Sequence, residues 1–358
     1  MKLAIYKDNL STGRGADHLV CAQAEGLAEL GYDTTLVTCP TDRPYTFDVG
    51  KNVKTAIVER TKVCDFIADF DVCIAAGSNE ILDLTQNGKT KPPVKSITEM
   101  LVAPLGFFKW KRFIRNHRIK KAFNLSDALV ILCRAYEKEV RKFAPLPRIA
   151  TIAEWPDTRE PTKEELADEK RTKTIIYPAA VNKMKNQLLL IRAFANLADE
   201  FPEWRLDIIG RHNKKYGAKC VGEVEKRLLG NRIGFLPFTS DLPSVYASAE
   251  IMAFPSLLEG FPLTIIEGAK FGLPAVVVDK LPGASDMIRD GENGIIAPNT
   301  VDGYANALRK LMSDDVLRRN MGDKAREICN NVHTKANVMA KWDNLIKEIY
   351  NKKEPQDE

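Results

Sequence analysis

The feature that most constrains the fold is a repeated alternation of short apolar runs with helix-like stretches. In the first half of the chain, apolar runs that are typical of buried strands recur at residues 3–6, 34–38, 53–58, 71–76, 94–98 and 127–132. Stretches with helical spacing of apolar residues separate several of these runs. Strands that alternate with helices predict parallel βαβ units, and therefore a doubly wound α/β sheet.

The alternation stops once and then starts again. Residues 145–173 hold four prolines and end in the charged stretch KEELADEKRTK, which indicates a linker. Beyond it, strand-like runs return at 174–181, 205–210, 232–238, 251–255, 274–279 and 294–298. The sequence therefore predicts two domains, one spanning residues 1–157 and the other 158–335, followed by a helix over about 336–351 with an apolar stripe that needs a packing surface.

Composition narrows the class of protein. The 358-residue chain is 44% hydrophobic and 28% charged, as in soluble globular proteins. It has no apolar run long enough to span a membrane, and its start, MKLAIYKD, does not resemble a secretory signal. The seven scattered cysteines form no C-x-x-C pair and no ligand cluster with histidine. We therefore expect a cytoplasmic protein with reduced thiols and no bound metal.

A basic segment stands out at Phe107–Phe123. It reads FFKWKRFIRNHRIKKAF and carries seven lysines or arginines between Lys109 and Lys121 without an acidic residue. Aromatic residues and cations at helical spacing fit a helix on an anionic membrane surface, peripheral to the inner face of a plasma membrane. A partly buried helix with a solvated basic flank fits equally well. No nucleic-acid motif accompanies the segment, so we expect no nucleic-acid partner.

Two glutamates near the start of a predicted helix indicate a candidate binding site. Glu259 and Glu267 flank a loop in which Gly260 and Pro262 keep the chain non-helical, and a helix is expected from about residue 262. Free N–H groups at a helix start attract phosphate oxygens. From one turn inside that helix, the Glu267 carboxylate can accept hydrogen bonds from both hydroxyls of a ribose, while Glu259 can approach a sugar. The alternative is that both glutamates are solvated surface residues.

The second half of the chain resembles glycosyltransferase family 4, whose members have the GT-B fold. The resemblance covers about 150 contiguous residues and includes the segments at 185–210, 235–256, 259–267, 290–298 and 321–328, in family order. In the first half it rests on the βα pattern alone. The resemblance implies two Rossmann-like domains that face each other across a cleft, with the final helix packing back on the first domain.

Site residues follow from the resemblance position by position. Glu267 would bind the ribose of the donor, Glu259 the transferred sugar, and Lys185 the diphosphate. Three further groups would complete the donor site: Phe261, Pro262, Leu263 and Thr264 on the distal part of the donor, Leu236 and Pro237 beside the base, and the glycine loop Gly13, Arg14 and Gly15. Glu259, Lys185 and Glu99 are the candidate catalytic residues.

The chain departs from the family pattern at three positions. Ala180 replaces the usual arginine five residues before the lysine, and Arg211 is the candidate that would compensate. Asp286 replaces the usual glutamate near 283–286. Thr98 and Glu99 occupy the place where many members carry a histidine after a strand of the first domain. Glu99 either contacts the sugar or the acceptor, or is a solvated glutamate at a strand end.

The resemblance also implies a reaction. It is the transfer of a hexose-type sugar from a nucleoside-diphosphate donor, a UDP- or GDP-sugar, to an acceptor hydroxyl with retention at the anomeric carbon. The acceptor would be a glycan or a lipid-linked glycan in lipopolysaccharide, O-antigen or capsule assembly, and no cofactor stays bound. Two alternatives share the fold: a sugar-nucleotide 2-epimerase, and a non-catalytic partner subunit that binds a nucleotide-sugar.

Overall fold

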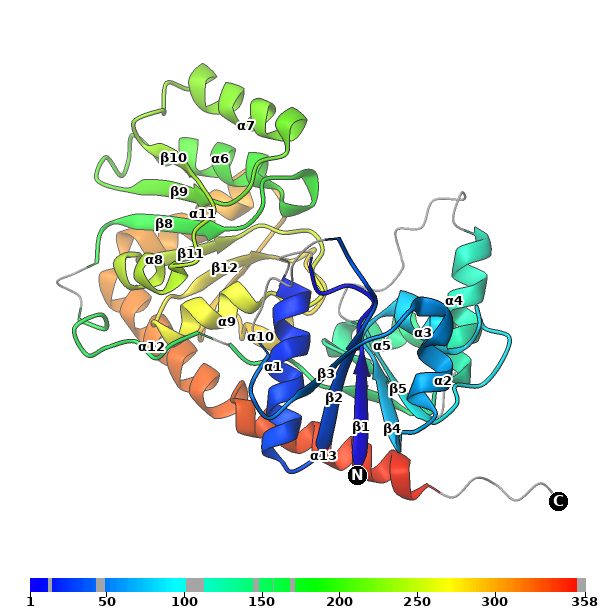
Figure 1. The fold of residues 1–358 in the computed structure, drawn as a ribbon. Coiled ribbons are helices and arrows are strands. Elements are labelled where there is room, and N and C mark those ends of the chain that lie inside the picture. Colours follow the sequence, from blue (N-terminus) through cyan, green and yellow to red (C-terminus); the bar gives the residue numbers. More distant parts are fainter. Residues whose placement is uncertain are drawn as a thin grey trace. The chain divides into compact units, whose positions relative to one another are not determined.

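The chain forms two compact units, which we describe separately. In the computed structural model, residues 1–11, 15–42, 49–100, 113–143, 148–156, 158–167 and 171–352 are described. The first unit comprises Met1–Glu154 together with Lys335–Glu358, and the second comprises Trp155–Thr334. Each unit is built on one parallel β-sheet with helices on both faces (Figure 1).

The first unit holds a seven-stranded sheet in the order β3-β2-β1-β4-β5-β6-β7. All the strand pairs are parallel. In chain order the strands are β1 (Lys2–Tyr6), β2 (Asp33–Thr38), β3 (Lys54–Ile57), β4 (Val72–Ala75), β5 (Lys95–Met100), β6 (Ala128–Ile131) and β7 (Ile149–Thr151). The order reverses direction between β1 and β4, which is the switch point of a doubly wound sheet.

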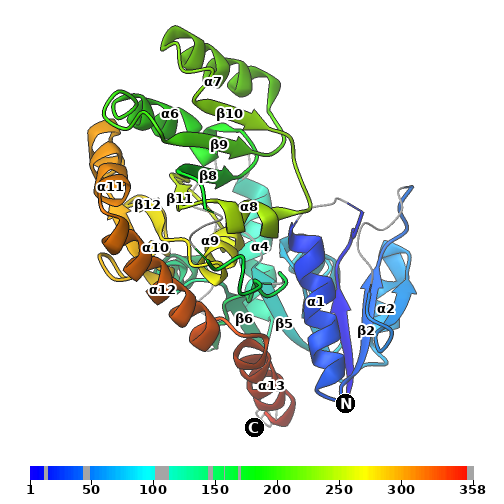
Figure 2. The ribbon, with the colours of Figure 1, turned by 90° about the vertical axis from the view of Figure 1, so that its left-hand side faces the viewer.

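Helices cover both faces of this sheet. They are α1 (Gly15–Glu29), α2 (Val63–Ile67), α3 (Ser78–Leu84), α4 (Phe113–Leu125), α5 (Glu137–Phe143) and α13 (Lys335–Asn351). Helix α13 packs against α1 and β5, whereas α3 packs against α2, α4, β4 and β5 (Figures 1 and 2). The apolar stripe of α13 is buried against its own unit, with Trp342 only 2% exposed.

The second unit holds a six-stranded parallel sheet in the order β10-β9-β8-β11-β12-β13. Its strands are β8 (Thr174–Pro178), β9 (Arg205–Ile209), β10 (Ile233–Leu236), β11 (Ile251–Phe254), β12 (Ala275–Val278) and β13 (Gly294–Ala297). Strands β8, β11 and β12 are buried at every residue, as expected for central strands that have helices on both faces.

Seven α-helices accompany this sheet within the described part of the second unit: α6 (Gln187–Ala195), α7 (Lys214–Lys226), α8 (Leu242–Ser248), α9 (Leu263–Lys270), α10 (Ala284–Met287), α11 (Val301–Ser313) and α12 (Asp315–Val332). Helix α6 packs on α7 and α11, while α9 packs on α12, β11 and β12. Side-chain caps define several starts: Thr300 accepts a hydrogen bond from Gly303 N–H, and Asp314 from Leu317 N–H, at 3.1 and 2.9 Å.

The predicted strands lie at or near the strands of the structure, but one strand was not predicted. Strand β7 lies inside residues 145–173, which the prolines had marked as a linker. It is three residues long, and a run of that length is too short for its pattern to be distinguished from a loop. The expectation of two doubly wound, Rossmann-like parallel sheets is confirmed.

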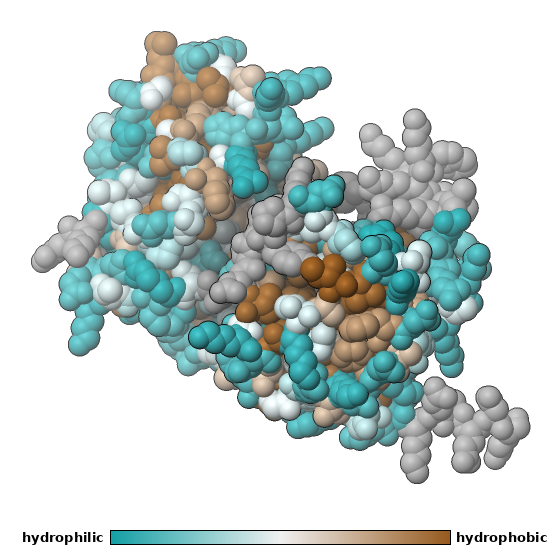
Figure 3. Space-filling view, viewed as in Figure 1, coloured by the Kyte–Doolittle hydropathy of each residue, from teal (hydrophilic) through white to brown (hydrophobic). Residues whose placement is uncertain are grey.

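The visible surface of the described residues is mixed in hydropathy. Hydrophilic side chains cover much of the face shown in Figure 3, and hydrophobic ones gather in a few patches between them. Among the described helices, none is both long and apolar enough to cross a membrane.

Candidate functional site

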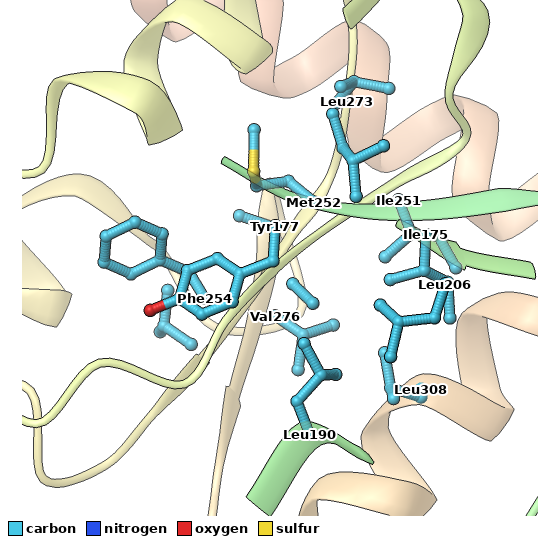
Figure 4. Close-up of a cluster of buried hydrophobic side chains, with 14 of the residues drawn as sticks. Ile175, Tyr177, Leu190, Leu206, Ile251, Met252, Phe254, Leu273, Val276 and Leu308 are labelled. Carbon is cyan, nitrogen blue, oxygen red and sulfur yellow. The ribbon is translucent and has the colours of Figure 1, made fainter. Parts of the chain in front are cut away.

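Two aromatic residues of the hydrophobic core support the candidate site of the second unit. Tyr177 at the end of β8 and Phe254 at the end of β11 pack edge to face, with ring centroids 5.5 Å apart (Figure 4). The Tyr177 hydroxyl donates to the Lys185 carbonyl at 2.8 Å and shares a 2.7 Å hydrogen bond with the Ser256 hydroxyl. A fully buried tyrosine therefore fixes the loops that follow two neighbouring strands at the carboxyl edge of the sheet.

The loop after β8 is shaped by two asparagines. Asn182 caps the 3₁₀ turn Lys183–Lys185 by accepting hydrogen bonds from the N–H groups of Met184 and Lys185. Asn186 has a left-handed backbone with φ 57°, and its side-chain amide donates to the carbonyl of Pro255 and to the side chain of Asn299. These contacts join the loops after β8, β11 and β13 and hold Lys185 in place.

Lys185 and Glu259 form an ion pair at the centre of this arrangement. Lys185 Nζ lies 2.5 Å from Glu259 Oε1, and the two side chains are 23% and 13% exposed. The same ammonium lies 5.8 Å from the centroid of the Phe254 ring. The structure thus brings together two predicted site residues that are far apart in the sequence, in a setting where a neighbouring anion would compete with Glu259 for the lysine.

Helix α9 supplies the predicted phosphate-binding end. The helix begins at Leu263, later by one residue than expected, and its N-cap residue Pro262 makes no side-chain capping hydrogen bond. The first N–H groups of a helix have no partner inside the helix and can bind an anion. Here Leu263 N–H donates to the carbonyl of Phe261 and Ile265 N–H to that of Pro262, each at 3.0 Å, so an anion would compete with these two contacts. Phe261, Leu263 and Thr264 are half-buried, Pro262 is buried, and Phe261 packs against His333 with ring centroids 5.9 Å apart.

Glu267 lies one turn into α9, where Tyr246 holds its carboxylate. Tyr246 is a fully buried residue of α8, and its hydroxyl donates to Glu267 Oε2 at 2.6 Å. Burial, followed by the negative charge of Glu267, raises the pKa of Tyr246 well above its ordinary value, so the phenol stays a donor. Glu267 is half-buried with a fixed orientation, which excludes the alternative of a freely solvated surface glutamate.

The segment predicted to lie beside a base is a surface with apolar side chains. Leu236 and Phe238 are 41% and 61% exposed, and Pro237 between them is exposed as well. Arg211, the proposed substitute for the arginine absent at Ala180, places its guanidinium 5.3 Å from the Phe238 ring centroid. In this structure Arg211 therefore lies against the predicted base segment.

A glycine makes this approach of loops possible. Gly210 directly follows β9 with φ +152°, and a Cβ atom there would lie 2.5 Å from the carbonyl oxygen of Ala179. Next to it, Val181 N–H donates to the Arg211 carbonyl at 2.8 Å. A side chain at position 210 would push apart the two loops that carry Lys185 and Arg211.

The predicted residues of the first unit are only partly described. Gly13 and Arg14 lie outside the described residues, and Gly15 begins helix α1. Glu99 is the fifth residue of β5 and is 2% exposed. The alternative of a solvated glutamate is wrong, because the strand carries the side chain into the interior between the sheet and its helices.

The basic segment is likewise only partly described. Residues 107–112 lie outside the described part, and α4 begins at Phe113. Ile119 and Phe123 are 1% and 2% exposed and belong to the core, whereas the basic side chains Arg118, Lys120 and Lys121 face solvent. The C-terminal part of the predicted membrane-binding segment is therefore a helix that packs on the core, because its apolar residues are buried inside the unit.

Three supporting residues were not predicted from the sequence. Tyr246, Tyr177 and Asn182 position Glu267 and Lys185, yet each looks like an ordinary core or capping residue in its local sequence. Their role becomes visible only once the fold brings distant segments together. Within the described residues, no group of three or more His, Cys, Asp or Glu side chains is arranged to hold a metal ion.

Comparisons with known proteins find glycosyltransferases among the proteins that are similar to this chain. Residues 158–328 match the family model "Glycosyl transferases group 1". Over 341 residues the chain is 24% identical to an uncharacterized glycosyltransferase of Haemophilus influenzae, covering 91% of this chain and 94% of that protein. It is 28% identical to the poly(glycerol-phosphate) alpha-glucosyltransferase of Bacillus subtilis over 44% of this chain, which spans only 23% of that longer protein.

A solved structure shows the same fold. The Anabaena protein HepE, crystallised in complex with UDP-glucose, matches 97% of this chain with a TM-score of 0.78 at 14% identity. The likeness establishes the GT-B architecture of two Rossmann-like domains. The family model, the relatives and the fold together support a glycosyltransferase with the GT-B fold.

Proposed function

We propose that the protein transfers a hexose-type sugar from a nucleoside-diphosphate donor to an acceptor hydroxyl, with retention at the anomeric carbon. The observation that carries this proposal is the contact between Lys185 and Glu259, 2.5 Å apart on loops that also lead into the N-terminus of α9. A cation and a helix N-terminus on one edge of a sheet suit a diphosphate, and carboxylates at the same edge suit the hydroxyls of a ribose and a sugar.

Each group has a role in the proposed reaction. Lys185 and the first N–H groups of α9 would hold the diphosphate and stabilise the charge that grows on it as the sugar leaves. Glu267, oriented by Tyr246, would accept hydrogen bonds from the ribose hydroxyls. Glu259 would turn from Lys185 to the hydroxyls of the transferred sugar. Leu236, Pro237 and Phe238 would pack beside the base, with Arg211 close by.

We propose a front-face route for the chemical step. The bond between the anomeric carbon and the diphosphate oxygen breaks, the acceptor oxygen bonds to the same face of that carbon, and the acceptor proton passes to the leaving phosphate oxygen. The route needs no covalent protein intermediate, and the leaving group takes the proton. The first unit would bind the acceptor, and Glu99 is its candidate catalytic residue.

The donor and the pathway are proposals of the same kind. UDP-glucose is bound to the structural neighbour HepE, and the Bacillus relative is named as a glucosyltransferase. These names favour a UDP-hexose over a GDP-sugar as donor. We also propose a cell-surface glycan as product, because the Bacillus relative is named for transfer to a polymer, poly(glycerol phosphate). We further propose a cytoplasmic protein that is peripheral to the membrane, with contact through the basic side chains of the segment Phe107–Phe123.

Product analysis tests the function. Purified protein is incubated with UDP- and GDP-hexoses, with and without a glycan acceptor extract, and release of nucleoside diphosphate is followed together with anomeric NMR of the product. Retained stereochemistry and release that depends on the acceptor support the proposal. Conversion of the donor to its epimer without acceptor would identify a 2-epimerase, an inverted product would refute retention, and donor binding without turnover would identify a non-catalytic subunit.

A further inference from the structure

A polar cavity of about 140 Å³ lies at the amino edge of the second sheet, where three neighbouring strands begin. Arg171 lies shortly before β8, Glu250 directly before β11, and Pro274 directly before β12. The rest of the lining comes from the linker, from the loop before β12 and from α12: Leu166, Gly272, Arg318, Arg319, Asp323 and Arg326. The candidate donor site lies at the opposite edge, beyond the carboxyl ends of the same strands.

Two glycines bring α12 close to the strand starts. Gly272 has a left-handed backbone with φ +73°, and a Cβ atom there would lie 3.4 Å from a terminal nitrogen of Arg171. A Cβ atom at Gly322 of α12 would overlap the carbonyl oxygen of Gly272. Because both positions lack a side chain, α12 packs directly on this loop, and the arginines on either side of Gly322 reach the cavity.

Positive charge exceeds negative charge around the cavity. Among the described residues that line it, four are arginines and two are carboxylates. Arg319, Asp323 and Arg326 are spaced by four and three residues, so they share one face of α12. A guanidinium group is planar and presents several N–H donors, which match the oxygens of a phosphate better than an ammonium does. Such a lining therefore favours a phosphate-type anion.

The two deeper arginines are held in fixed positions. Arg318 is 3% exposed and donates to Glu250 at 2.5 Å. Arg171 donates through both terminal nitrogens to the carbonyls of Ala249 and Phe271, at 3.1 and 2.5 Å. Side chains that are already ordered lose little freedom when a ligand binds, so this part of the cavity is preorganised.

The two outer arginines can change partners. Arg319 is exposed and Arg326 is half-buried, and Arg326 donates to Asp323 at 3.1 Å. The Asp323 side chain is 70% exposed, so this ion pair lies in water and contributes little. A phosphate in the cavity can therefore take the place of Asp323 beside Arg326 at small cost.

The size of the cavity limits what can enter. Since a water molecule takes up ~30 Å³ in the liquid, the cavity has room for about four or five waters. A phosphate group with a few waters fits this room, whereas a nucleoside diphosphate does not. Strand β8 has five residues and spans ~16 Å, which separates the cavity from the donor edge.

We propose that this cavity is a second anion site, which binds inorganic phosphate or the phosphate group of a small phosphate ester. Arg171 and Arg318 form its inner part, and Arg319 and Arg326 close over the anion at its mouth. The proposal goes beyond glycosyl transfer and does not depend on it, because the residues of the cavity are separate from those of the donor edge.

Calorimetry of the full-length protein tests the site. Sodium phosphate and glucose 6-phosphate are titrated at constant ionic strength, with sodium chloride as blank, into Lys185→Met, so that phosphate binding at the donor edge is suppressed. This protein should bind one phosphate group with a Kd of about 1 mM or below. Adding Arg319→Met and Arg326→Met should weaken binding at least about tenfold, because two charge-assisted contacts are lost. Adding Arg227→Met and Arg309→Met instead removes two arginines that pair with glutamates elsewhere in the unit, and should leave binding unchanged.

Two results would overturn the proposal: no saturable binding of either ligand to Lys185→Met at about 10 mM, or equal binding after loss of Arg319 and Arg326. If that combined variant does not fold, Arg319→Met alone decides, because it changes an exposed position and should still weaken binding several-fold. Tighter binding of glucose 6-phosphate than of phosphate would support an ester as ligand, and the reverse order would support the free anion.

The anion site and the donor site can fail separately. Loss of nucleotide binding in Lys185→Met bears on the donor edge alone, because the cavity is intact in that variant. Loss of phosphate binding on removal of Arg319 and Arg326, with nucleotide binding retained when Lys185 is present, shows two distinct sites. Loss of both ligands on removal of these two arginines would contradict the separation of the sites.

Discussion

The ion pair between Lys185 and Glu259 provides the sharpest test of the donor site. We consider Lys185→Met, Glu259→Gln and the double variant. At the observed separation of 2.5 Å, two unit charges attract by about 7 kcal/mol at an effective dielectric constant of ~20. Desolvation and side-chain ordering offset most of that attraction. Because the side chains are only 23% and 13% exposed, we expect a net coupling of about 1–2 kcal/mol, above that of most surface pairs.

Urea unfolding of the four proteins without ligand measures this coupling. Each single variant should lose stability, and the double variant should lose less than the two single losses together, by about 1–2 kcal/mol. Lys185→Met should also weaken binding of a nucleoside diphosphate about 10- to 100-fold, because a charge-assisted hydrogen bond to phosphate contributes about 1.5–3 kcal/mol. Glu259→Gln should leave that binding intact, because it frees Lys185 for the phosphate.

The control for this experiment lies in the same 3₁₀ turn. Lys183 is exposed, so Lys183→Met changes the net charge equally without touching the ion pair. It should leave both stability and nucleotide binding near the wild-type values. Strictly additive single variants, or tight nucleotide binding by Lys185→Met, would refute the assignment of this pair to the donor site.

Three further predictions concern stability and orientation. Tyr246→Phe removes the 2.6 Å hydrogen bond to Glu267, so urea unfolding should show a loss of about 1–3 kcal/mol in unfolding free energy. Calorimetry should show a several-fold weaker affinity for the donor. An affinity equal to that of the wild type would contradict the role of Tyr246 in orienting Glu267. Burial raises the pKa of Glu154 from 4.5 to about 7, so the stability that this group contributes is complete below about pH 4.5 and is lost as pH rises to about 7. In Glu154→Gln this pH dependence should be absent, so the difference in unfolding free energy between variant and wild type should change by about 3 kcal/mol between pH 5 and pH 8. A difference that is the same at both pH values would disprove the raised pKa of Glu154. Arg318→Met breaks the 2.5 Å contact of a 3% exposed guanidinium with Glu250 and should cost about 3–5 kcal/mol of unfolding free energy, whereas a loss below about 1 kcal/mol would show that the contact is dispensable.

The fold could be read from the sequence because its central strands are continuous apolar runs. Strand β12, AVVV, and strand β6, ALVI, are buried at every residue, and only parallel strands covered on both faces need such runs. Strand β7 was not predicted, because three residues are too few to show a strand pattern. At that edge of the sheet, pairing with β6 and tertiary packing decide the conformation.

The candidate site was less accessible to sequence reasoning. Lys185 and Glu259 were each expected at a donor, but no local pattern says that their side chains meet. Tyr246 gave no signal, because a tyrosine in a short helix looks like any core residue. Glu99 was left open between a functional and a solvated side chain. Its burial depends on the elements that pack around β5, among them β4, β6 and α13, and α13 is distant in the chain.

Calorimetric titration of nucleotides tests the central claim, that the second unit binds a nucleoside diphosphate at the edge formed by Lys185, the start of α9 and Glu267. UDP, GDP and their hexose derivatives are titrated into the wild type, into Glu267→Ala and into the control Glu292→Ala, which removes an exposed glutamate from a loop of the same unit. We predict that the wild type and the control bind one of these nucleotides equally, and that Glu267→Ala binds it at least about tenfold more weakly, while its circular dichroism stays unchanged. Equal affinity in Glu267→Ala, or no binding of any of these nucleotides by the wild type, would contradict the account.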